Sequence, residues 1–281
     1  MKKARLLIFV VAYNHEKFVE SVISRIPKKL SKLYDLEILI IDDASKDNTF
    51  EISKKIQMLY KKKGIFKINV FYNSINQGYG GNQKIGYHYS IKKKFDFVVL
   101  LHGDGQYAPE ELPKLLDCLN YGKFDVVIGS RMIKKKNALK GGMPLYKLIG
   151  NIILTKIQNF LLKTKLAEYH TGYRIYSVES LKKIPFLFNT NDFHFDTEIL
   201  IQLVMNKEKI KEVSIPTFYG NEICHVNGMK YAFNVLRVSL LASLQEMMRL
   251  NFSKKFKIKR YPEKFSNLYI DKLLQKAMKG K

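Results

Sequence analysis

Residues 97–106 read Phe-Val-Val-Leu-Leu-His-Gly-Asp-Gly-Gln, five apolar residues in succession followed by a polar turn with two glycines and a carboxylate. An apolar run of this length without alternation is typical of a β-strand that is covered on both faces. The chain holds four more such runs: Leu6–Val11, Leu36–Ile41, Ile68–Tyr72 and Val126–Ile128. Because amphipathic segments lie between the runs, we predict an α/β domain with a mostly parallel sheet and helices on both faces.

Helix signals occur between these runs and beyond them. Asn48 and Glu51 form the pattern of a capping box, and Pro109, followed by two glutamates, begins a helix with a stripe of leucines. The second half of the chain predicts longer elements: a helix opened by Pro144, helices over 197–205 and 231–250, and a strand at Val213–Phe218.

No internal repeat and no Ser/Pro-rich linker divides the 281 residues. We therefore expect one α/β domain over residues 1–225 and a basic, partly apolar helical extension over residues 226–281.

The run Arg5–Ala12 is short for the apolar region of a signal peptide and leads into polar residues, so we interpret it as the first strand. A conventional membrane span is not expected, because no apolar stretch of about 18 residues lacks charge. Cys118 and Cys224 show no CxxC spacing, which predicts neither a disulfide framework nor a zinc site and fits a reducing compartment.

The chain carries 49 Lys+Arg against 25 Asp+Glu, a formal charge of +24, while 46% of its residues are apolar. That apolar content excludes a disordered polyelectrolyte. The positive charge suits an anionic partner such as nucleic acid, a membrane surface or phosphate groups. Only seven of the basic residues are arginine, although readout of nucleic-acid bases favours arginine. Part of the charge lies in a tail, since residues 251–281 hold ten basic and two acidic side chains.

Polar side chains follow every predicted strand of the first half. They lie in Ala12–Glu16, Asp42–Ser45, Asn73 with Asn76–Gly78, His102–Gln106 and Gly129–Arg131. Ligands of open α/β sheets bind beyond the carboxyl ends of the strands, so we expect these segments to share one edge of the sheet. Carboxylates, glycines and an arginine at one edge suit a nucleotide, a divalent cation and a diphosphate.

The motifs occur in an order that resembles a known family. The matching segments are 12–16, 42–49, 76–82, 102–106, 129–131 and 171–174. From Leu6 to Tyr219 the chain is similar to the family 2 inverting glycosyltransferases of GT-A fold, and among them to those like dolichyl-phosphate mannose synthase. The resemblance implies the GT-A fold, a Rossmann-like, mostly parallel sheet, with the C-terminal residues as a helical extension.

The resemblance also implies the residues that bind a nucleotide-sugar donor. They are Tyr13, Glu16, Asp43, Gly78, Asp104 and Lys147. Asp43 would hold the base and ribose, although a carboxylate at this place also caps turns. Gly78 would let the backbone approach a phosphate, although glycine there is ordinary turn chemistry as well.

Residues 102–106 occupy the place of the family's Asp-x-Asp metal motif. The resemblance makes Asp104 a ligand of Mg²⁺ or Mn²⁺, with Gln106 a second side chain that reaches the metal; the cation would bridge the protein and the donor diphosphate. His102 departs from the motif, because imidazole suits Mn²⁺ better than Mg²⁺ and adds no negative charge. Three interpretations stay open: His102 binds the metal as a neutral ligand, it contacts the ligands without binding the metal itself, or the enzyme depends only weakly on a metal.

Three further residues, Arg131, Arg174 and Asp196, are expected to serve catalysis. Arg131 and Arg174 lie inside motifs, where a guanidinium can hold a diphosphate or an acceptor phosphate; the alternative is a salt bridge that fixes a loop. Lys147 lies where relatives often have a further arginine. Asp196 is the residue that we expect to act on the acceptor; the alternative is that it only caps a helix. A phosphate acceptor needs no general base, whereas a hydroxyl acceptor does.

We therefore expect an inverting glycosyltransferase that uses a nucleotide-diphosphate sugar and a polyprenyl phosphate acceptor, with a hydroxyl of a cell-surface glycan as the alternative acceptor. The apolar helix over 231–250 beside the basic tail suggests an anionic membrane surface as a partner, with the enzyme in the cytoplasm at the inner face of the cytoplasmic membrane.

Nucleotidyl transfer is disfavoured, because no Gly-rich basic loop follows the first strand. A basic nucleic-acid- or membrane-binding protein without catalysis is the rival outside the enzymes, and nucleic acid is not the expected partner. The donor base, the sugar and the oligomeric state stay open.

Overall fold

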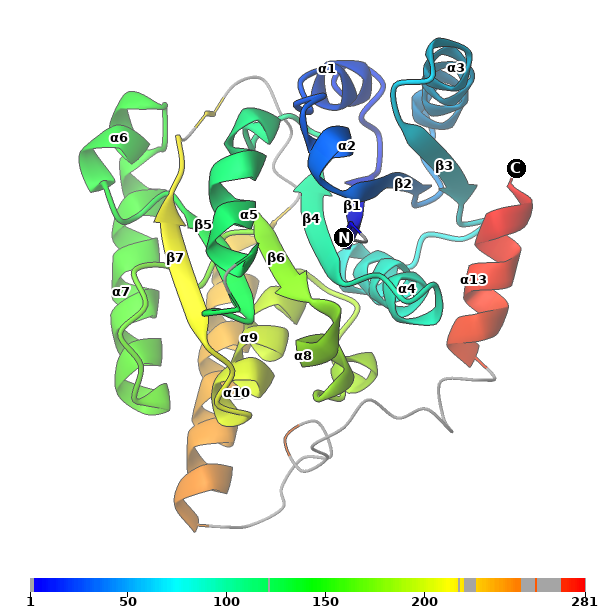
Figure 1. Ribbon diagram of the computed structural model, residues 1–281. Coiled ribbons are helices and arrows are strands. Elements are labelled where there is room, and N and C mark those ends of the chain that lie inside the picture. Colours follow the sequence, from blue (N-terminus) through cyan, green and yellow to red (C-terminus); the bar gives the residue numbers. More distant parts are fainter. Residues whose placement is uncertain are drawn as a thin grey trace.

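The computed structural model describes residues 3–120, 122–216, 218–219, 226–248, 256 and 269–280. The described residues contain a seven-stranded sheet in the order β3-β2-β1-β4-β6-β5-β7 (Figure 1). The strands are β1 (Arg5–Ala12), β2 (Asp35–Asp42), β3 (Lys67–Tyr72), β4 (Phe97–His102), β5 (Val126–Ser130), β6 (Arg174–Ser177) and β7 (Ile210–Ser214). Only β6 runs antiparallel to its neighbours, β4 and β5, so the prediction of a mostly parallel sheet is confirmed.

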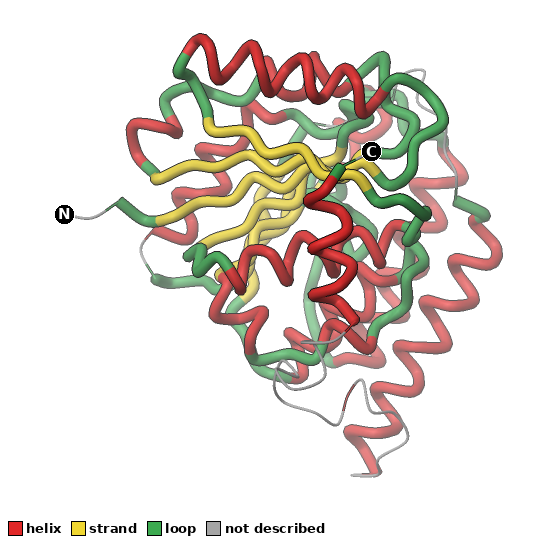
Figure 2. The backbone as a smooth tube through the Cα atoms, turned by 90° about the vertical axis from the view of Figure 1, so that its right-hand side faces the viewer, coloured by secondary structure: helices red, strands yellow, loops and turns green. Residues whose placement is uncertain are grey.

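Helices cover both faces of this sheet, as predicted (Figure 2). On one face pack α1 (Val19–Ser24), α3 (Thr49–Lys63) and α5 (Leu112–Asn120), which follows the 3₁₀ turn Pro109–Glu111. On the other face pack α4 (Tyr79–Lys92), α8 (Val178–Lys182), α9 (Phe195–Met205) and α13 (Tyr269–Lys279). Further helices in the described part of the chain are α2 (Leu30–Leu33), α6 (Lys135–Lys140), α7 (Leu145–Leu162) and α10 (Gly228–Met248), with a second 3₁₀ turn at Phe186–Phe188.

Strand β1 explains why the apolar runs do not alternate with polar residues. Leu7 and Phe9 point into the core on the α4 side, whereas Leu6 and Ile8 point into the core on the α1 side. All four are fully buried, because β1 pairs with β2 on one side and β4 on the other and has a helix layer over each face. Successive side chains of a strand point to opposite faces, so a strand between two helix layers needs apolar residues at every position.

Two strands differ from the sequence-based expectation. The four-residue strand β6 was not predicted, because its sequence Arg-Ile-Tyr-Ser carries no apolar run; pairing with β4 and β5 makes it a strand. The strand predicted at Val213–Phe218 is instead Ile210–Ser214, so its predicted bounds were wrong. Its position is set by parallel pairing with β5, in which Ile210 lies opposite Val126, and the local sequence does not show this register.

The capping box predicted for α3 is only partly correct. Asn48 is the N-cap residue, but its side chain makes no capping hydrogen bond. The carboxylate of Asp47 accepts the N–H of Thr49 at 3.0 Å instead, and the Asn48 amide donates to Glu16 of another loop at 3.1 Å. The cap residue is therefore used to join two loops.

The C-terminal residues pack on the α/β core. Helix α10 lies against α7 and α9, and α13 lies against α4 and β3, where Ile270, Leu274 and Ala277 are buried (Figure 1). The division into residues 1–225 and 226–281 stays a prediction. Cys224 and most of the basic tail from Asn251 onward lie outside the described residues. Among the helices described, none has the length and apolar character needed to cross a membrane.

Candidate functional site

The loops after β1 and β2 are joined by hydrogen bonds at the carboxyl edge of the sheet. The Asn14 N–H donates to Ser45 at 2.9 Å, and the Asn14 side-chain oxygen accepts the N–H of Lys46 at 2.8 Å. The Glu16 carboxylate accepts the N–H of Asn48 at 3.0 Å. The first two predicted nucleotide-binding loops thus form one wall, with Glu16 engaged in holding it.

Two buried carboxylates, Asp42 and Asp43, lie where β2 ends. Asp43 accepts the side-chain N–H of Asn73 at 2.8 Å and the backbone N–H of Gln77 at 2.9 Å, so it holds the loop between β3 and α4. Asp42 accepts the N–H of Ser45 at 2.8 Å, and burial raises the pKa of Asp42 to about 6. Burial also raises the pKa of Asp43, against the lowering effect of its hydrogen bonds. The structure places Asp43 at the predicted edge; its contact with a nucleotide stays a prediction.

The glycines that open α4 allow a close approach of two backbones. Gly78 has a φ of 76°, and a Cβ there would lie 2.6 Å from the carbonyl oxygen of Asn191. A Cβ on Gly80 would lie 2.5 Å from the carbonyl oxygen of Thr190, and the Gly80 N–H donates to the Asn191 carbonyl at 2.8 Å. Lys84, one turn further, donates to the Asn191 side chain at 2.6 Å. These residues bring the 190–191 loop, and with it the start of α9, to the predicted donor edge.

The predicted metal motif lies where β4 ends. His102 Nδ1 and Asp104 Oδ2 are 3.9 Å apart, and their side chains are 15% and 19% exposed. The other Asp104 oxygen accepts the backbone N–H of Gln106 at 3.0 Å. Burial raises the pKa of Asp104, but the hydrogen bond and charge of a protonated His102 ring, the charge of a protonated His15 ring and the Gln106 N–H outweigh it, so the pKa lies below its usual value.

These groups fit a divalent cation that is shared with a substrate. Within the described ranges, no group of three or more His, Cys, Asp or Glu side chains could hold a metal ion alone. The Asp104 carboxylate and the His102 imidazole face each other, and both are chemical groups that can bind metal ions. Oxygen atoms of a bound diphosphate would have to complete the coordination.

Asp196, predicted from sequence as the acceptor-side residue, is brought to the same place. Its two carboxylate oxygens accept hydrogen bonds from the Tyr79 hydroxyl at 2.7 Å and from the Gln83 amide at 3.2 Å. The Tyr79 hydroxyl is also 2.9 Å from His102 Nε2. Sequence reasoning did not single out Tyr79; an aromatic residue between the glycines that open α4 was the available signal. Asp196 is buried, and its contact with an acceptor stays a prediction.

Arg131 is held by Glu168, a residue that sequence reasoning missed. The fully buried Glu168 carboxylate accepts the Arg131 backbone N–H at 2.7 Å and two N–H groups of its guanidinium, one of them at 3.0 Å. Burial lowers the pKa of Arg131, but the Glu168 charge outweighs this effect and raises it. Arg131 also donates to the Tyr219 hydroxyl at 3.2 Å, and Lys147 lies 5.3 Å from the centre of the Tyr219 ring. The predicted phosphate-binding residues Arg131 and Lys147 therefore converge on Tyr219.

Arg174 occupies the interior instead of the open edge. Its three guanidinium nitrogens donate to the carbonyl oxygens of Thr171, Asp196 and Tyr169 at 2.8, 2.6 and 2.8 Å. Arg174 is fully buried and fixes the segment that enters β6. The alternative predicted a salt bridge for this purpose, whereas these hydrogen bonds go to backbone carbonyl oxygens. Its contact with a phosphate stays a prediction.

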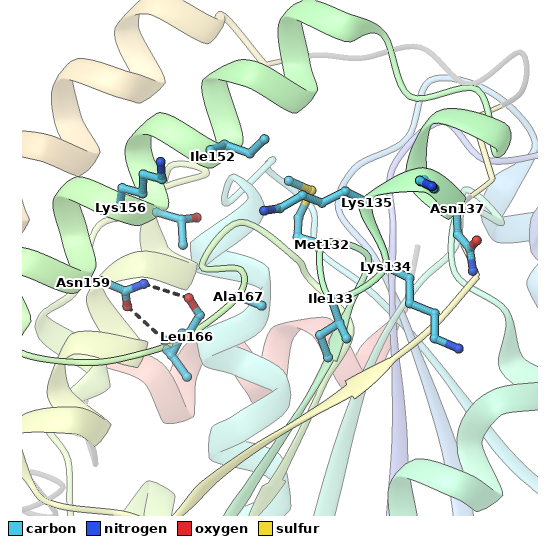
Figure 3. A pocket seen from close by; sticks show the side chains of 12 residues that line it. Met132, Ile133, Lys134, Lys135, Asn137, Ile152, Lys156, Asn159, Leu166 and Ala167 are labelled. Atoms are coloured by element: carbon cyan, nitrogen blue, oxygen red, sulfur yellow. Dashed lines mark hydrogen bonds between the residues drawn. The ribbon is translucent and has the colours of Figure 1, made fainter.

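A cationic hollow of about 790 Å³ lies beyond the end of β5 (Figure 3). It is lined by Met132, Ile133, Lys134, Lys135, Lys136, Asn137, Ile152, Thr155, Lys156, Asn159, Leu166 and Ala167. Figure 3 shows Ile152 and Lys156 on α7 facing the segment that carries Met132 and Lys134. Since the lining has four lysines and no acidic residue, the hollow attracts anions.

Next to this hollow, α7 exposes a row of large apolar side chains. Its members are Tyr146, Ile149, Ile153, Ile157 and Phe160, which we call the α7 stripe. Their spacing of three and four residues puts them on one side of the helix. Tyr146 is 72% exposed and Phe160 83% exposed. The neighbouring helix α10 also exposes Phe233 and Leu240. An exposed apolar row such as the α7 stripe is of the kind that marks a protein or membrane contact.

With this geometry established, comparison with known proteins shows the family of the chain. The family description "Glycosyl transferase family 2" matches residues 7–185. The chain belongs to glycosyl transferase family 2. The prediction of a glycosyltransferase is thereby confirmed.

Two relatives and one solved structure indicate what the chain is similar to. It is 30% identical to a UDP-N-acetylglucosamine–dolichyl-phosphate N-acetylglucosaminyltransferase of Methanococcus voltae, over 76% of this chain and 86% of the relative. It is 24% identical to the polyprenol monophosphomannose synthase of Mycolicibacterium smegmatis, over 78% and 79%. Its fold is similar to that of glucosyl-3-phosphoglycerate synthase from Mycobacterium tuberculosis in complex with Mn²⁺, UDP-glucose and phosphoglyceric acid, with a TM-score of 0.60, 16% identity and coverage of 85% and 79%. The predicted GT-A fold is confirmed.

Proposed function

We propose that this family 2 enzyme transfers a sugar from a nucleotide-diphosphate donor, with inversion, to a polyprenyl phosphate at a membrane surface. One observation carries the proposal: the first turn of α7 holds both Lys147, which lies against Tyr219 as Arg131 does, and Tyr146, which begins the α7 stripe. A phosphate on a long apolar chain needs these two surfaces side by side. The two curated relatives described above are named for dolichyl phosphate and for a polyprenol product, which supports the same acceptor class.

The donor would lie against the wall formed by the loops after β1, β2 and β3. Tyr13, Glu16 and Asp43 would contact the nucleoside, and Gly78 the region of its phosphates. Asp104 and His102, with Gln106 beside them, would hold Mg²⁺ or Mn²⁺ together with the diphosphate. When bound, the cation neutralises charge on the departing nucleoside diphosphate. The Mn²⁺ and UDP-glucose named for the similar solved structure support this arrangement.

The acceptor phosphate would approach Arg131 and Lys147. Since Glu168 compensates most of the Arg131 charge, Lys147 supplies the more available positive charge, and Arg131 supplies N–H donors in a fixed orientation. A phosphate oxygen is already anionic at neutral pH and attacks the sugar carbon without a general base. Arg174 would act by fixing the neighbouring segment. Asp196 would act through its hydrogen bond with the Tyr79 hydroxyl.

The membrane contact would be made by the α7 stripe and by α10. Apolar side chains of an interfacial helix enter the boundary between headgroups and acyl chains, while lysines beside them attract anionic lipids. Lys156 and the other lysines of the cationic hollow lie beside the stripe and suit this role. We place the enzyme at the inner face of the cytoplasmic membrane, where nucleotide sugars and anionic lipids are both available.

The direct test is incubation of labelled UDP-, GDP- or dTDP-sugars with Mn²⁺ or Mg²⁺ and dolichyl or undecaprenyl phosphate, followed by extraction into organic solvent. We expect label in the organic phase, and Asp104→Asn should reduce it at least 100-fold because the carboxylate beside His102 is neutralised. Asp117→Asn on the exposed side of α5 is the matched control and should leave transfer unchanged.

Three results separate the alternatives. Label that appears only in an aqueous glycan overturns the lipid acceptor in favour of a hydroxyl acceptor. Transfer that survives Asp104→Asn overturns the predicted site. Salt-sensitive binding to DNA without transfer to any acceptor supports the non-catalytic rival. Thermal shifts with the three classes of nucleotide sugar identify the donor base, since a ligand that binds only the folded state raises its stability.

A further inference from the structure

A chain of side chains runs from Asp196 to Asp104 through the residue that departs from the family's metal motif. The Tyr79 hydroxyl donates to Asp196 Oδ2 at 2.7 Å and lies 2.9 Å from His102 Nε2. The other ring nitrogen of His102, Nδ1, lies 3.9 Å from Asp104 Oδ2. The four side chains come from α9, α4, β4 and the turn after β4.

The direction of these hydrogen bonds follows from the chemistry of the groups. A carboxylate only accepts hydrogen bonds, and Tyr79 has a single hydroxyl proton, which it donates to Asp196. The Tyr79 oxygen must then accept from His102, so the proton of the neutral imidazole lies on Nε2. Nδ1 consequently carries a lone pair, and it faces the oxygen of Asp104. Two electron-pair donors that face each other in this way suit a cation between them.

Packing keeps the His102 ring in this orientation. Tyr79 stacks on Phe193 with 5.4 Å between ring centres, and His102 meets the edge of Tyr107 at 5.0 Å. A Cβ on Gly172 would lie 2.3 Å from His102 Nε2 and 2.8 Å from the Tyr79 hydroxyl. Only glycine at position 172 therefore leaves room for the hydrogen bond between Tyr79 and His102.

We infer that Tyr79, itself held by Asp196, is a positioning residue that fixes the Nε2–H form of His102 and turns its Nδ1 lone pair toward Asp104 as a neutral second ligand for a divalent cation. The inference rests on the cation site of the proposed function. Metal-binding histidines generally have a hydrogen-bond partner on the other ring nitrogen, and that partner sets the tautomer. In this site the partner is the Tyr79 hydroxyl, which is itself hydrogen-bonded to the Asp196 carboxylate. Asp196 then serves the site without touching the substrate.

The test measures Mn²⁺ binding and the His102 tautomer, and both readouts are independent of sugar transfer. Tyr79→Phe keeps the stacked ring and removes the hydroxyl, so we expect Mn²⁺ affinity in the presence of UDP, measured by electron paramagnetic resonance, to fall about tenfold. Tyr173→Phe is the matched control: it removes another hydroxyl of a buried tyrosine, one that donates to the Ala108 carbonyl at 3.1 Å, and should leave the affinity unchanged.

A double-variant cycle separates positioning from a general loss of structure. In a His102→Ala background, Tyr79→Phe should have no further effect on Mn²⁺ affinity, and additive losses overturn the inference. The wild-type enzyme provides a readout that needs no variant: ¹⁵N NMR of the imidazole should show the proton on Nε2, with Nδ1 shifting when Mg²⁺ and UDP are added. A proton on Nδ1 in the neutral ring, or no Mn²⁺ binding by wild type, also overturns it. If the polyprenyl phosphate acceptor is wrong, in contrast, the labelled product does not enter the organic phase, but the Mn²⁺ affinity and the His102 tautomer stay as expected.

Discussion

Replacing Glu168 by glutamine is expected to lower the free energy of unfolding by about 3–5 kcal/mol, the usual cost of leaving one partner of a buried ion pair unpaired. The residues have similar volume, so packing is retained and the lost charge dominates. The Glu168 carboxylate accepts the backbone N–H and guanidinium of Arg131 and the Asn151 amide, the last at 3.1 Å. Both charged partners lie in the interior, where water cannot compensate Arg131.

Urea unfolding followed by circular dichroism measures this loss. The control is Glu110→Gln, which breaks the two-bond pair with Arg25 at 2.6 and 2.9 Å. Because those side chains are 52% and 37% exposed, that change should cost at most about 1 kcal/mol. Arg131→Met added to Glu168→Gln should restore part of the lost stability, since it removes the unpaired charge. Equal losses for the buried and exposed pairs, or no recovery in the double variant, would refute this reasoning.

Two further predictions concern pH and the membrane. Since burial raises the pKa of Asp42 to about 6 from 3.8, the folded state binds a proton that the unfolded chain has released, so stability falls as pH rises from about 4 to 6, by roughly 3 kcal/mol. Asp42→Asn should abolish this fall, and unfolding curves with the same pH dependence as wild type would contradict it. Phe160→Ser should weaken sedimentation with phosphatidylglycerol vesicles several-fold, whereas Met58→Ser, at an exposed site on α3, should not; equal effects would remove the α7 stripe from the contact.

Much of the fold was predictable because it depends on local pattern. Strands β1 to β5 were identified from apolar runs, which are required wherever a strand is covered on both faces. The parallel direction of those strands brings Asp43, Asp104 and Arg131 to one edge, so motif positions alone predicted a common site. The short strand β6 and the bounds of β7 could not be predicted in this way, since pairing with distant strands determines them.

The sequence by itself determined the family, the α/β sheet and the set of polar residues at its edge, because these depend on local patterns and motif spacing. Tertiary structure alone decided how those residues are paired. Arg131 meets Glu168, Arg174 turns into the interior, and Tyr79 joins Asp196 to His102 across 117 and 23 residues of sequence. A buried polar group must find a partner, and the topology of the chain, not its neighbours in sequence, determines which partner is within reach.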